Sequence, residues 1–390
     1  MALTVGSGIG VFVVVFLIAA IATPVGIGGG LLFTPLLQIS LGFAQNQAVA
    51  LSQVLVSGAS LGSLLYQIAW QYRHANSLLL VQGQWVYILL PSITAGSVLG
   101  VFLSRVLPMF VQPLTLAAIC AFSTWNILSK GIVLYRKESA DRRAKRSLET
   151  GVPPTVVGLS REKLSDDSPM SQVTTPLPLM SRATKLLCLF VVGVFLLNLF
   201  LTLIKGSEVH SSFSGIEYCG TSYWIVYGFQ FLVFFGLSLF LSLNHWKLSL
   251  FITAAGAIAT FTGIGGGIVM GPVLLGRGLS PQQSSATSMI MVTCMSLSAA
   301  IDFLYSGLVP AWQSAFALVT FAASGLGMSL IAGIVKKTGR SSLIVLILGG
   351  LVAFGGAATL GVGINNAITN YKKGIDPFSF QSLCPSYSIV

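Results

Sequence analysis

The chain has 390 residues, of which 54% are hydrophobic and only 8% are charged, and its mean hydropathy is +0.87. Charged residues make up about a quarter of ordinary soluble domains, so this composition excludes a soluble enzyme, a disordered chain and a small disulfide-stabilised domain. The formal net charge is +11, but ten of the 21 lysines and arginines lie between residues 136 and 185. This clustering follows the positive-inside rule of membrane proteins and does not indicate nucleic-acid binding.

The first 135 residues are predicted to contain four membrane elements. A bilayer-spanning helix needs about 20 apolar residues, and three stretches reach this length after an initial Gly-rich apolar segment. The Gly-rich segment and the three spans cover residues 8–42, 44–70, 85–104 and 109–134. We expect residues 1–135 to form a first transmembrane repeat.

The Gly-rich segment is too long to be one straight spanning helix. At about 1.5 Å per residue, residues 8–42 would extend about 50 Å, whereas the hydrocarbon core is about 30 Å thick. Glycine lowers helix propensity and proline lacks a backbone donor, so we expect the helix to break and turn back at its glycines and proline. The residues of this predicted break are Gly26, Gly28, Gly29, Gly30 and Pro35.

The middle of the chain combines a charged segment with two further spans. Residues 136–183 are rich in basic residues, serine, threonine and proline, which predicts a basic, disordered cytoplasmic loop. Residues 184–247 are predicted to contain two linking spans, over 184–204 and 222–243.

Residues 248–364 are predicted to form a second transmembrane repeat, followed by a C-terminal tail over residues 365–390. This repeat also begins with a Gly-rich segment that is followed by three spans. They cover residues 248–279, 284–305, 312–335 and 342–362.

The two halves share a sequence motif at a constant spacing. The segment Gly26-Ile27-Gly28-Gly29-Gly30 recurs as Gly263-Ile264-Gly265-Gly266-Gly267, and Pro35 recurs as Pro272; 263 − 26 and 272 − 35 both give 237. After a shift of one residue, Gly42, Ala50 and Ser52 match Gly278, Ala286 and Ser288, each 236 residues further along. We therefore predict an all-α polytopic membrane protein of about ten membrane elements in two pseudosymmetric halves.

The distribution of positive charge bears on the path of the second Gly-rich segment. If the basic loop is inside and residues 248–279 re-enter on the same side, Arg277 and the basic turn at 336–340 are also inside. This re-entrant path makes the two repeats inverted, and it would place Cys219 and Cys384 together on the outer face, where they could pair. A single crossing would instead put these two cysteines on opposite sides.

The glycine motifs admit a structural and a functional interpretation. Small residues allow close packing of membrane helices, which is sufficient to account for the pairs Gly58/Gly62 and Gly96/Gly100. A half-helix that begins at an unwound segment presents free N–H groups and the positive end of its dipole, which suits an anion. Interrupted segments at equivalent positions of two halves are also typical of a transporter's binding site.

The predicted anion site therefore combines glycines of both motifs with neutral donors that follow them. The neutral side chains would act as hydrogen-bond donors, or alternatively would only link helices to one another. The candidate residues are Gly26, Gly28, Gly29, Gly30, Gly263, Gly265, Gly266 and Gly267, with Ser52, Gln53, Ser285, Thr287 and Ser288. Pro35 and Pro272 are the predicted helix-breaking prolines.

Asp302 is the one acidic residue that the predicted spans contain. An ionisable group inside a membrane is costly and therefore suggests function, so Asp302 is a candidate for proton coupling. Its position near the end of its span is equally consistent with an interfacial or structural role. No metal-ligand or nucleophile motif accompanies the three histidines, so we expect no enzyme, no metal and no cofactor.

The paired motif resembles the TauE/SafE family of sulfite and organosulfonate exporters. The second copy, with Ala286-Thr287-Ser288, matches the family pattern more fully than the first, which has Ala50-Leu51-Ser52. Two C-terminal features, Thr338-Gly339-Arg340 and a tail containing Cys384, are similar to the plant and protist branch. The resemblance covers both repeats but not the loop at 136–183.

The resemblance implies a multi-pass membrane transporter that exports a small anion, with sulfite or an organosulfonate as its substrate. Alternating access is the mechanism we predict, with Asp302 as the candidate for proton coupling, in either the plasma membrane or an endomembrane. A passive anion channel is one alternative. A membrane scaffold or receptor that uses the basic loop is another. The expected partners are the substrate anion and the lipid bilayer, without nucleic acid and with no prediction of oligomeric state.

Overall fold

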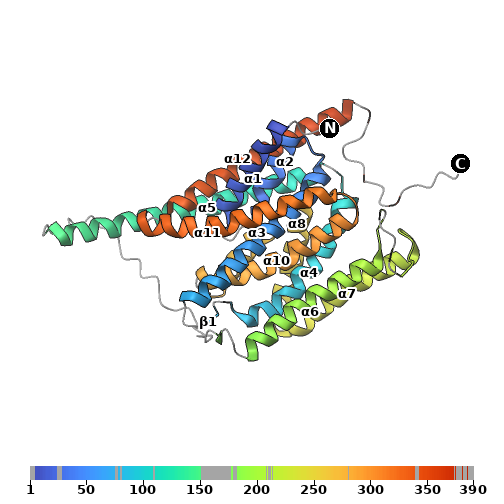
Figure 1. Cartoon of the computed structure of the whole chain (residues 1–390), viewed down its shortest axis with the longest axis horizontal. Coiled ribbons are helices and arrows are strands. Elements are labelled where there is room, and N and C mark those ends of the chain that lie inside the picture. The colour runs from blue at the N-terminus through green and yellow to red at the C-terminus, as the bar shows by residue number, and fades with distance from the viewer. Residues whose placement is uncertain are drawn as a thin grey trace.

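The structure is a computed structural model of the whole chain and confirms an all-α polytopic membrane protein (Figure 1). It describes residues 5–23, 29–74, 78–79, 81–108, 110–150, 177–178, 182–207, 209, 212, 214–279, 281–338, 342–372, 374, 380 and 384. Within these residues, seven helices are long and apolar enough to cross a membrane.

The first half of the chain forms five helices. They are α1 (Val5–Ala22), α2 (Gly30–Leu41), α3 (Gln45–His74), α4 (Gly83–Val106) and α5 (Val111–Thr150). Two helices in the middle of the chain follow, α6 (Arg182–Lys205) and α7 (Thr221–Leu241). A two-residue strand before α4, β1 (Leu78–Leu79), pairs antiparallel with β2 (Leu177–Pro178) before α6.

The second half repeats the order of the first. Its helices are α8 (Trp246–Thr262), α9 (Gly267–Gly276), α10 (Pro281–Tyr305), α11 (Phe316–Thr338) and α12 (Ser342–Lys372). Two short 3₁₀ segments precede α8 and α11, at Leu243–His245 and Ala311–Ala315. In each half, a short helix after a break precedes three longer helices.

The helix contacts come in corresponding pairs. Helix α4 packs against α8, and the corresponding helices α11 and α1 also pack against each other. Likewise, α3 packs against α11, and the corresponding helices α10 and α4 pack against each other. The equivalent helices α3 and α10 also contact each other, as do α5 and α12. Two repeats related by a twofold axis would produce this pattern; the inverted relation of the repeats stays a prediction.

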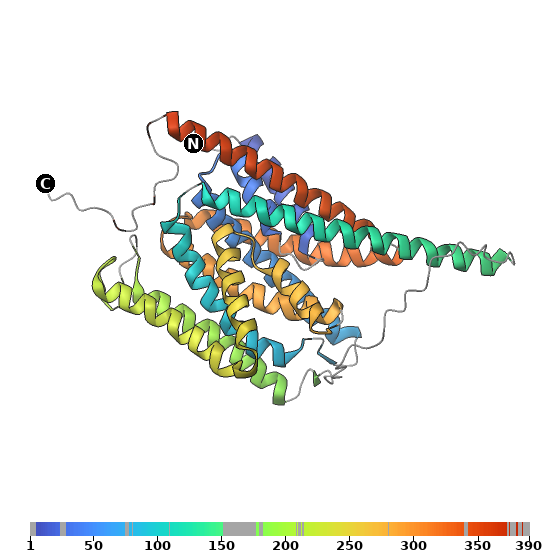
Figure 2. The same ribbon diagram turned by 180° about the vertical axis from the view of Figure 1, so that it is seen from behind.

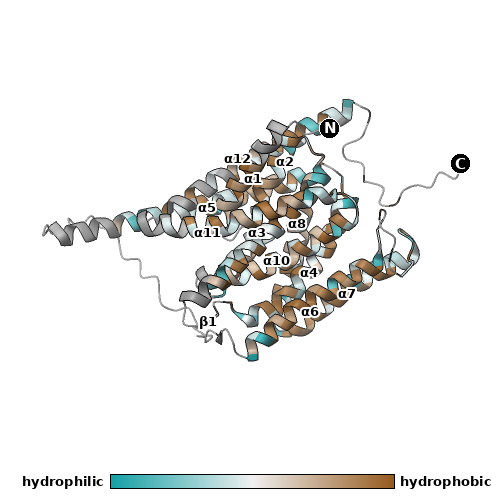
Figure 3. Ribbon diagram, in the orientation of Figure 1, coloured by the Kyte–Doolittle hydropathy of each residue, from teal (hydrophilic) through white to brown (hydrophobic). Residues whose placement is uncertain are grey.

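The interior and the lipid-facing surface are built from different helices. Buried apolar residues of α3 and α10, such as Leu55 and Met291, belong to the two largest core clusters. Helices α6 and α7 lie along one edge of the molecule and α5 with α12 along the opposite edge, as both views show (Figures 1 and 2). Large apolar side chains such as Leu189, Phe200 and Phe240 are exposed on α6 and α7, whose hydrophobic surface is evident in Figure 3.

Three sequence predictions differ from the structure. Helix α5 continues to Thr150, so residues 136–150 of the predicted disordered loop are helical, because lysine, arginine, glutamate and alanine are good helix formers. Helix α12 continues to Lys372, eight residues into the predicted tail. Residues 151–176 of the loop lie outside the described residues.

The third difference concerns the prolines. Pro35 lies inside α2 and Pro272 inside α9, so the chain breaks at the glycines and not at the prolines. The missing N–H of Pro35 removes the helical bond to the carbonyl of Leu31. At this place Gly355 of α12 approaches closely, because a Cβ added to it would lie 3.4 Å from the Leu31 oxygen.

The second Gly-rich element is re-entrant. The ring of Trp85, at the start of α4, lies 6.3 Å from the ring of His245, which precedes α8. The guanidinium of Arg277, which follows α9, lies 5.4 Å from the same Trp85 ring. The element therefore begins and ends at the same end of the molecule, as the re-entrant path requires.

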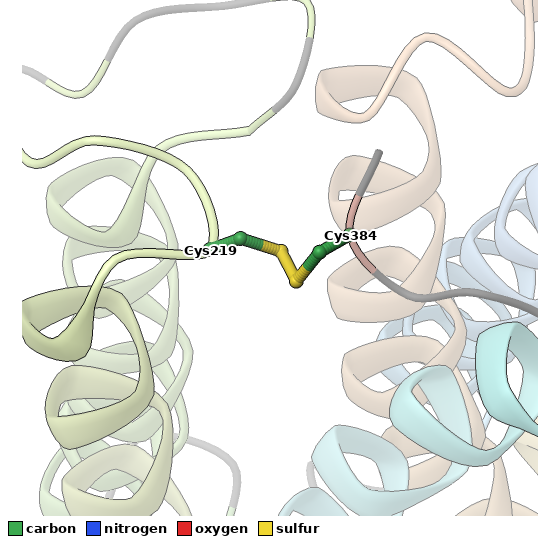
Figure 4. The surroundings of a disulfide bond; sticks show 2 residues. All are labelled: Cys219 and Cys384. Atoms are coloured by element: carbon green, nitrogen blue, oxygen red, sulfur yellow. A yellow bond between two sulfur atoms is a disulfide. The ribbon is translucent and has the colours of Figure 1, made fainter. Parts of the chain in front are cut away.

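Cys219 and Cys384 form a disulfide, as shown in Figure 4. Their Cα atoms are 5.8 Å apart although 165 residues separate them in the chain. The bond joins the segment between α6 and α7 to the region after α12, so these two segments lie on the same face. This is the pairing expected from the re-entrant path.

Candidate functional site at the crossing of two helix breaks

The two short helices begin in the same way. Gly29 precedes α2 with φ 79° and Gly266 precedes α9 with φ 72°, and neither helix start has a side-chain cap. This left-handed conformation suits glycine, which lacks a Cβ. The N-terminal N–H groups of an α-helix have no acceptor within the helix. Both half-helices therefore begin at unwound, uncapped backbone, as the repeated motif predicts.

The backbones of the two breaks touch. A Cβ added to Gly30 would lie 2.4 Å from the carbonyl oxygens of both Gly263 and Ile264, which is far inside van der Waals contact. Only glycine at position 30 therefore permits this approach. The structure thus brings together two motifs that are more than 200 residues apart in the chain.

Ser52 of α3 links the two breaks by hydrogen bonds. Its hydroxyl oxygen lies 2.8 Å from the carbonyl oxygen of Gly263 and 3.4 Å from that of Gly30. One hydroxyl proton serves one acceptor at a time, and the shorter distance favours Gly263. The side chain of Ser52 is fully buried, so this bond is made away from solvent, where an unmade bond is costly.

Gln53, the next residue of α3, contacts the end of α8. Its Nε2 lies 3.4 Å from the carbonyl oxygens of both Ala259 and Thr260. These carbonyls belong to the last turn of α8 and also accept hydrogen bonds from the backbone N–H groups of Gly263 and Ile264. Gln53 therefore adds a side-chain donor to the end of α8.

The crossing contains unpartnered polar groups but no charged side chain. Among the described residues, Oε1 of Gln53 and Oγ1 of Thr260 are buried without a hydrogen-bond partner, as is Oγ of Ser288 in α10, a helix that packs against α3 and α4. The segments 29–69, 249–276 and 278–301, which supply the breaks and the helices around them, contain no lysine, arginine, aspartate or glutamate. Hydroxyl and backbone donors are thus the groups available to an anion.

Apolar side chains cover the second break. A Cβ added to Gly265 would lie 2.5 Å from Val56, and one added to Gly266 would lie 3.1 Å from Met295 and 3.3 Å from Ile93. These residues come from α3, α10 and α4. The break in the second half is therefore enclosed by three long helices and not exposed to lipid.

Several predicted site residues are used elsewhere or lie outside the description. Thr287 is buried and accepts a hydrogen bond from the Gln82 N–H at 3.1 Å, so it supports the start of α4. Ser285 is only partly buried in the same turn of α10. Gly26 and Gly28 lie outside the described residues, and Gly267 is the first residue of α9.

Two polar contacts were not predicted from the sequence. Thr34 of α2 directs its Oγ1 toward the Gly30 carbonyl at 3.5 Å. The hydroxyls of Ser60 and Ser296 lie 3.4 Å apart between α3 and α10, and the two residues are 236 positions apart. This separation equals the repeat spacing, so extending the repeat alignment along these helices would have found the serine pair.

The paired glycines outside the motifs have the structural role expected of them. Cβ atoms added to Gly58 and Gly62 would lie 2.2 and 2.4 Å from carbonyl oxygens of α11. Cβ atoms added to Gly96 and Gly100 would lie 2.3 and 2.5 Å from carbonyl oxygens of α8. Each pair therefore allows two helix backbones to make direct contact.

Asp302 does not belong to the crossing. Its Oδ1 lies 3.5 Å from Nζ of Lys205, the last residue of α6, and both side chains are buried. The Lys205 ammonium also lies 4.5 Å from the centre of the Tyr227 ring of α7. The structure thus gives Asp302 a counter-ion, and proton coupling through this residue stays a prediction.

Comparisons with known proteins agree with the geometry. A family model described as "Sulfite exporter TauE/SafE" matches residues 11–161. The chain is 27% identical to "Sulfite exporter TauE/SafE family protein 1" of Arabidopsis thaliana, with 92% of this chain and 84% of the relative covered. Family protein 5 of the same plant is 26% identical, covering 93% of this chain and 85% of its own length.

The comparisons bear on one prediction directly. The expected resemblance to the TauE/SafE family is confirmed, and it extends over both halves of the chain. No solved structure matches the chain.

Proposed function

From its relationship to the TauE/SafE family and its multi-pass membrane fold, we propose that this chain is a transporter that carries a small anion, sulfite or an organosulfonate, across the membrane. The family is one of membrane transporters by name, and the Arabidopsis relatives are named as sulfite exporters. The anion would bind where the two half-helices begin, and export would proceed by alternating access.

The contact between the two helix breaks is the observation that carries this proposal. The N-terminus of α2 lies against the backbone that links α8 to α9, and both α2 and α9 begin after an αL glycine without a side-chain cap. Backbone N–H groups at such starts bind anions without a positively charged side chain. A neutral site has the further advantage that it releases an anion more readily than a buried lysine would.

The polar groups around the breaks support an oxyanion substrate. The hydroxyls of Thr260 and Ser288 are buried and lack acceptors among the described residues. Each of them has a proton to donate, and an oxyanion supplies several acceptor oxygens. A carboxylate beside the site would repel such a substrate, and none occurs in the segments 29–69, 249–276 and 278–301 around the breaks.

Alternating access would use the contacts between the half-helices and the long helices. The Ser52 bond to Gly263 holds the two breaks together in the observed arrangement. Moving one half against the other requires this bond to exchange partners, while the Gly-lined contacts of α3 with α11 and of α4 with α8 allow sliding. The substrate would then face one side of the membrane in each arrangement.

The proposal is tested by uptake of radiolabelled sulfite into proteoliposomes, with sulfate, taurine, sulfolactate and chloride as competitors. We expect saturable uptake, inhibition by sulfite-like or sulfonate competitors, and counterflow when unlabelled substrate is loaded inside. The variant Gly267→Leu, which fills the start of α9, should abolish the flux while the protein remains folded. Full flux in that variant would remove the site from the proposal.

The same assay separates a transporter from a channel. A passive anion channel would conduct without saturation and without counterflow. Repeating the uptake with and without a pH gradient tests proton coupling, and Asp302→Asn should change the pH dependence if this residue carries the proton. An unchanged pH profile in that variant would assign Asp302 to its ion pair alone.

A further inference from the structure

A cluster of charged side chains lies at the disulfide-bearing end of the molecule, away from the crossing. It consists of Arg105 in the last turn of α4, Lys205 at the end of α6, Asp302 of α10 and Tyr227 of α7. The segment that carries Cys219 begins directly after Lys205. Four helices thus contribute to one buried polar cluster that is separate from the crossing.

The cluster contains more positive than negative charge. In the part of the chain that the structure describes, Asp302 pairs with Lys205 at 3.5 Å, and this distance is long for an ion pair. Among the described residues, Nε of Arg105 is inaccessible to solvent and has no hydrogen-bond partner. The Phe102 ring, one turn before Arg105 on α4, lies 5.8 Å from the Tyr227 ring that contacts Lys205, and α4 also packs against α6, so the two cations lie at the same end of the helix bundle.

Tyr227 contacts the Lys205 ammonium but does not neutralise it. The ring of Tyr227 lies beneath the Lys205 ammonium, and its hydroxyl donates to the Val98 carbonyl of α4 at 2.5 Å. This cation–π contact is weaker than an ion pair, and the ring itself provides no hydrogen-bond acceptor for the ammonium protons. Arg105 lies in the last turn of α4, where the helix dipole favours a positive charge. The dipole does not, however, provide a hydrogen-bond acceptor for the Nε–H group.

We propose that Arg105 and Lys205 form a binding site for a small oxyanion at the disulfide-bearing face. An oxyanion between the two side chains would accept from Nε–H of Arg105 and from the ammonium of Lys205, and it would balance the second positive charge. When no anion is bound, Asp302 is the counter-ion of the Lys205 ammonium. The choice of sulfite and sulfate as probes rests on the proposed function; the site itself does not.

The site is tested by equilibrium binding of radiolabelled sulfite and sulfate to the purified full-length protein. Arg105→Gln should weaken binding at least about tenfold, which corresponds to about 1.4 kcal/mol. Asp302→Asn should strengthen it, because the competing carboxylate is removed. This opposite effect of two neighbouring substitutions is not expected if the residues only stabilise the fold.

Matched variants control for charge and for folding. Lys185→Gln removes the same charge from the opposite end of α6, where the side chain is exposed, and should leave affinity within about twofold of wild type. Arg105→Gln removes a cation whose Nε has no hydrogen-bond partner among the described residues, so its thermal stability without anion should not fall. The double variant Lys205→Gln/Asp302→Asn removes both members of the ion pair, retains Arg105 and should also bind weakly.

The results also separate this site from the crossing. Binding that depends on Arg105 and persists in the transport-inactive Gly267→Leu variant assigns the anion to the cluster, whether or not the protein transports. Normal affinity in Arg105→Gln would overturn the proposal. Glu208 lies outside the described part of the chain. A tenfold gain in anion affinity in Glu208→Gln would also overturn the proposal, because Glu208 would then be the group that balances the second positive charge.

Discussion

At the residue scale, one serine hydroxyl connects two backbone segments from opposite halves of the chain. Ser52 reaches the Gly263 carbonyl, and that oxygen lies beyond the last helical turn of α8. The carbonyl has no helical donor there. The hydroxyl therefore compensates for the break that the glycines create, and the same glycines make room for it.

The first prediction concerns this bond. Ser52→Ala should reduce the free energy of unfolding by about 1–3 kcal/mol, because a buried carbonyl loses its donor, and it should reduce sulfite flux. Ser57→Ala is the control, since the Ser57 hydroxyl bonds only to the Val54 carbonyl of its own helix, which keeps its helical donor. Thermal unfolding and uptake of both variants are the measurements, and equal effects would contradict a special role for Ser52.

The second prediction concerns the closest backbone contact. Gly30→Ala should destabilise the protein by about 1–3 kcal/mol, because the new Cβ overpacks a site where two carbonyl oxygens lie 2.4 Å from it. Gly271→Ala in α9 meets no atom within 4 Å and should be neutral or stabilising. Flux in proteoliposomes should fall only in the first variant. A fully active Gly30→Ala protein would show that the breaks do not need to touch.

At the element scale, the half-helices show that glycine and proline affect a helix differently. The glycines adopt left-handed φ values and end the helical path, whereas the prolines are accommodated one to two turns later. Each proline removes one hydrogen bond but has a φ compatible with a helix. The prediction that the helices break at the glycines was therefore correct, whereas the prediction that the prolines break them was wrong.

The third prediction addresses the packing of long helices. Gly96→Ala should lower the unfolding temperature, because its Cβ would lie 2.3 Å from the Thr253 carbonyl and push α4 away from α8. Gly193→Ala in α6 meets nothing within 4 Å and should have no such effect. Unfolding of both variants in detergent measures the difference. Equal stability would indicate that α4 and α8 can separate without cost.

At the scale of the whole molecule, the disulfide and the re-entrant element define one consistent arrangement in the membrane. The disulfide brings the region after α12 to the face where α6 ends. The contacts of Trp85 with His245 and Arg277 place both ends of the α8–α9 element at the start of α4. The positive-inside rule predicts that the basic end of α5 lies on the cytoplasmic side, and this orientation stays a prediction.

The fourth prediction tests this arrangement. In a variant with Cys120, Cys188 and Cys294 replaced by serine, an impermeant maleimide should label sealed vesicles only after reduction. Both remaining cysteines should then react from the same side. Labelling of one cysteine from each side would contradict the shared face and with it the re-entrant path.

The fifth prediction concerns the segment between α5 and α6. Deletion of residues 151–176 should leave flux within about twofold of wild type, because function in a transporter resides in the site and not in a connecting segment. Helix α5 and strand β2 are kept intact by this choice. Uptake and membrane expression of the deletion variant are the measurements. Complete loss of function with normal expression would favour the scaffold or receptor interpretation.

The sequence by itself determined the membrane class, the helical elements, the two breaks and the family, because bilayer thickness sets span length and glycine sets where a membrane helix can end. The repeat spacing also identified Ser52 and Ser288. Side-chain roles inside α10 were less predictable, since Thr287 and Ser288 are neighbours with different surroundings.

Only the tertiary structure decided which of these residues meet. The contact of Gly30 with Gly263 and the pairing of Lys205 with Asp302 join segments from different helices. Such contacts depend on how closely helices approach and on their rotation about their own axes. Both quantities follow from many packed side chains at once, and no local sequence pattern contains them.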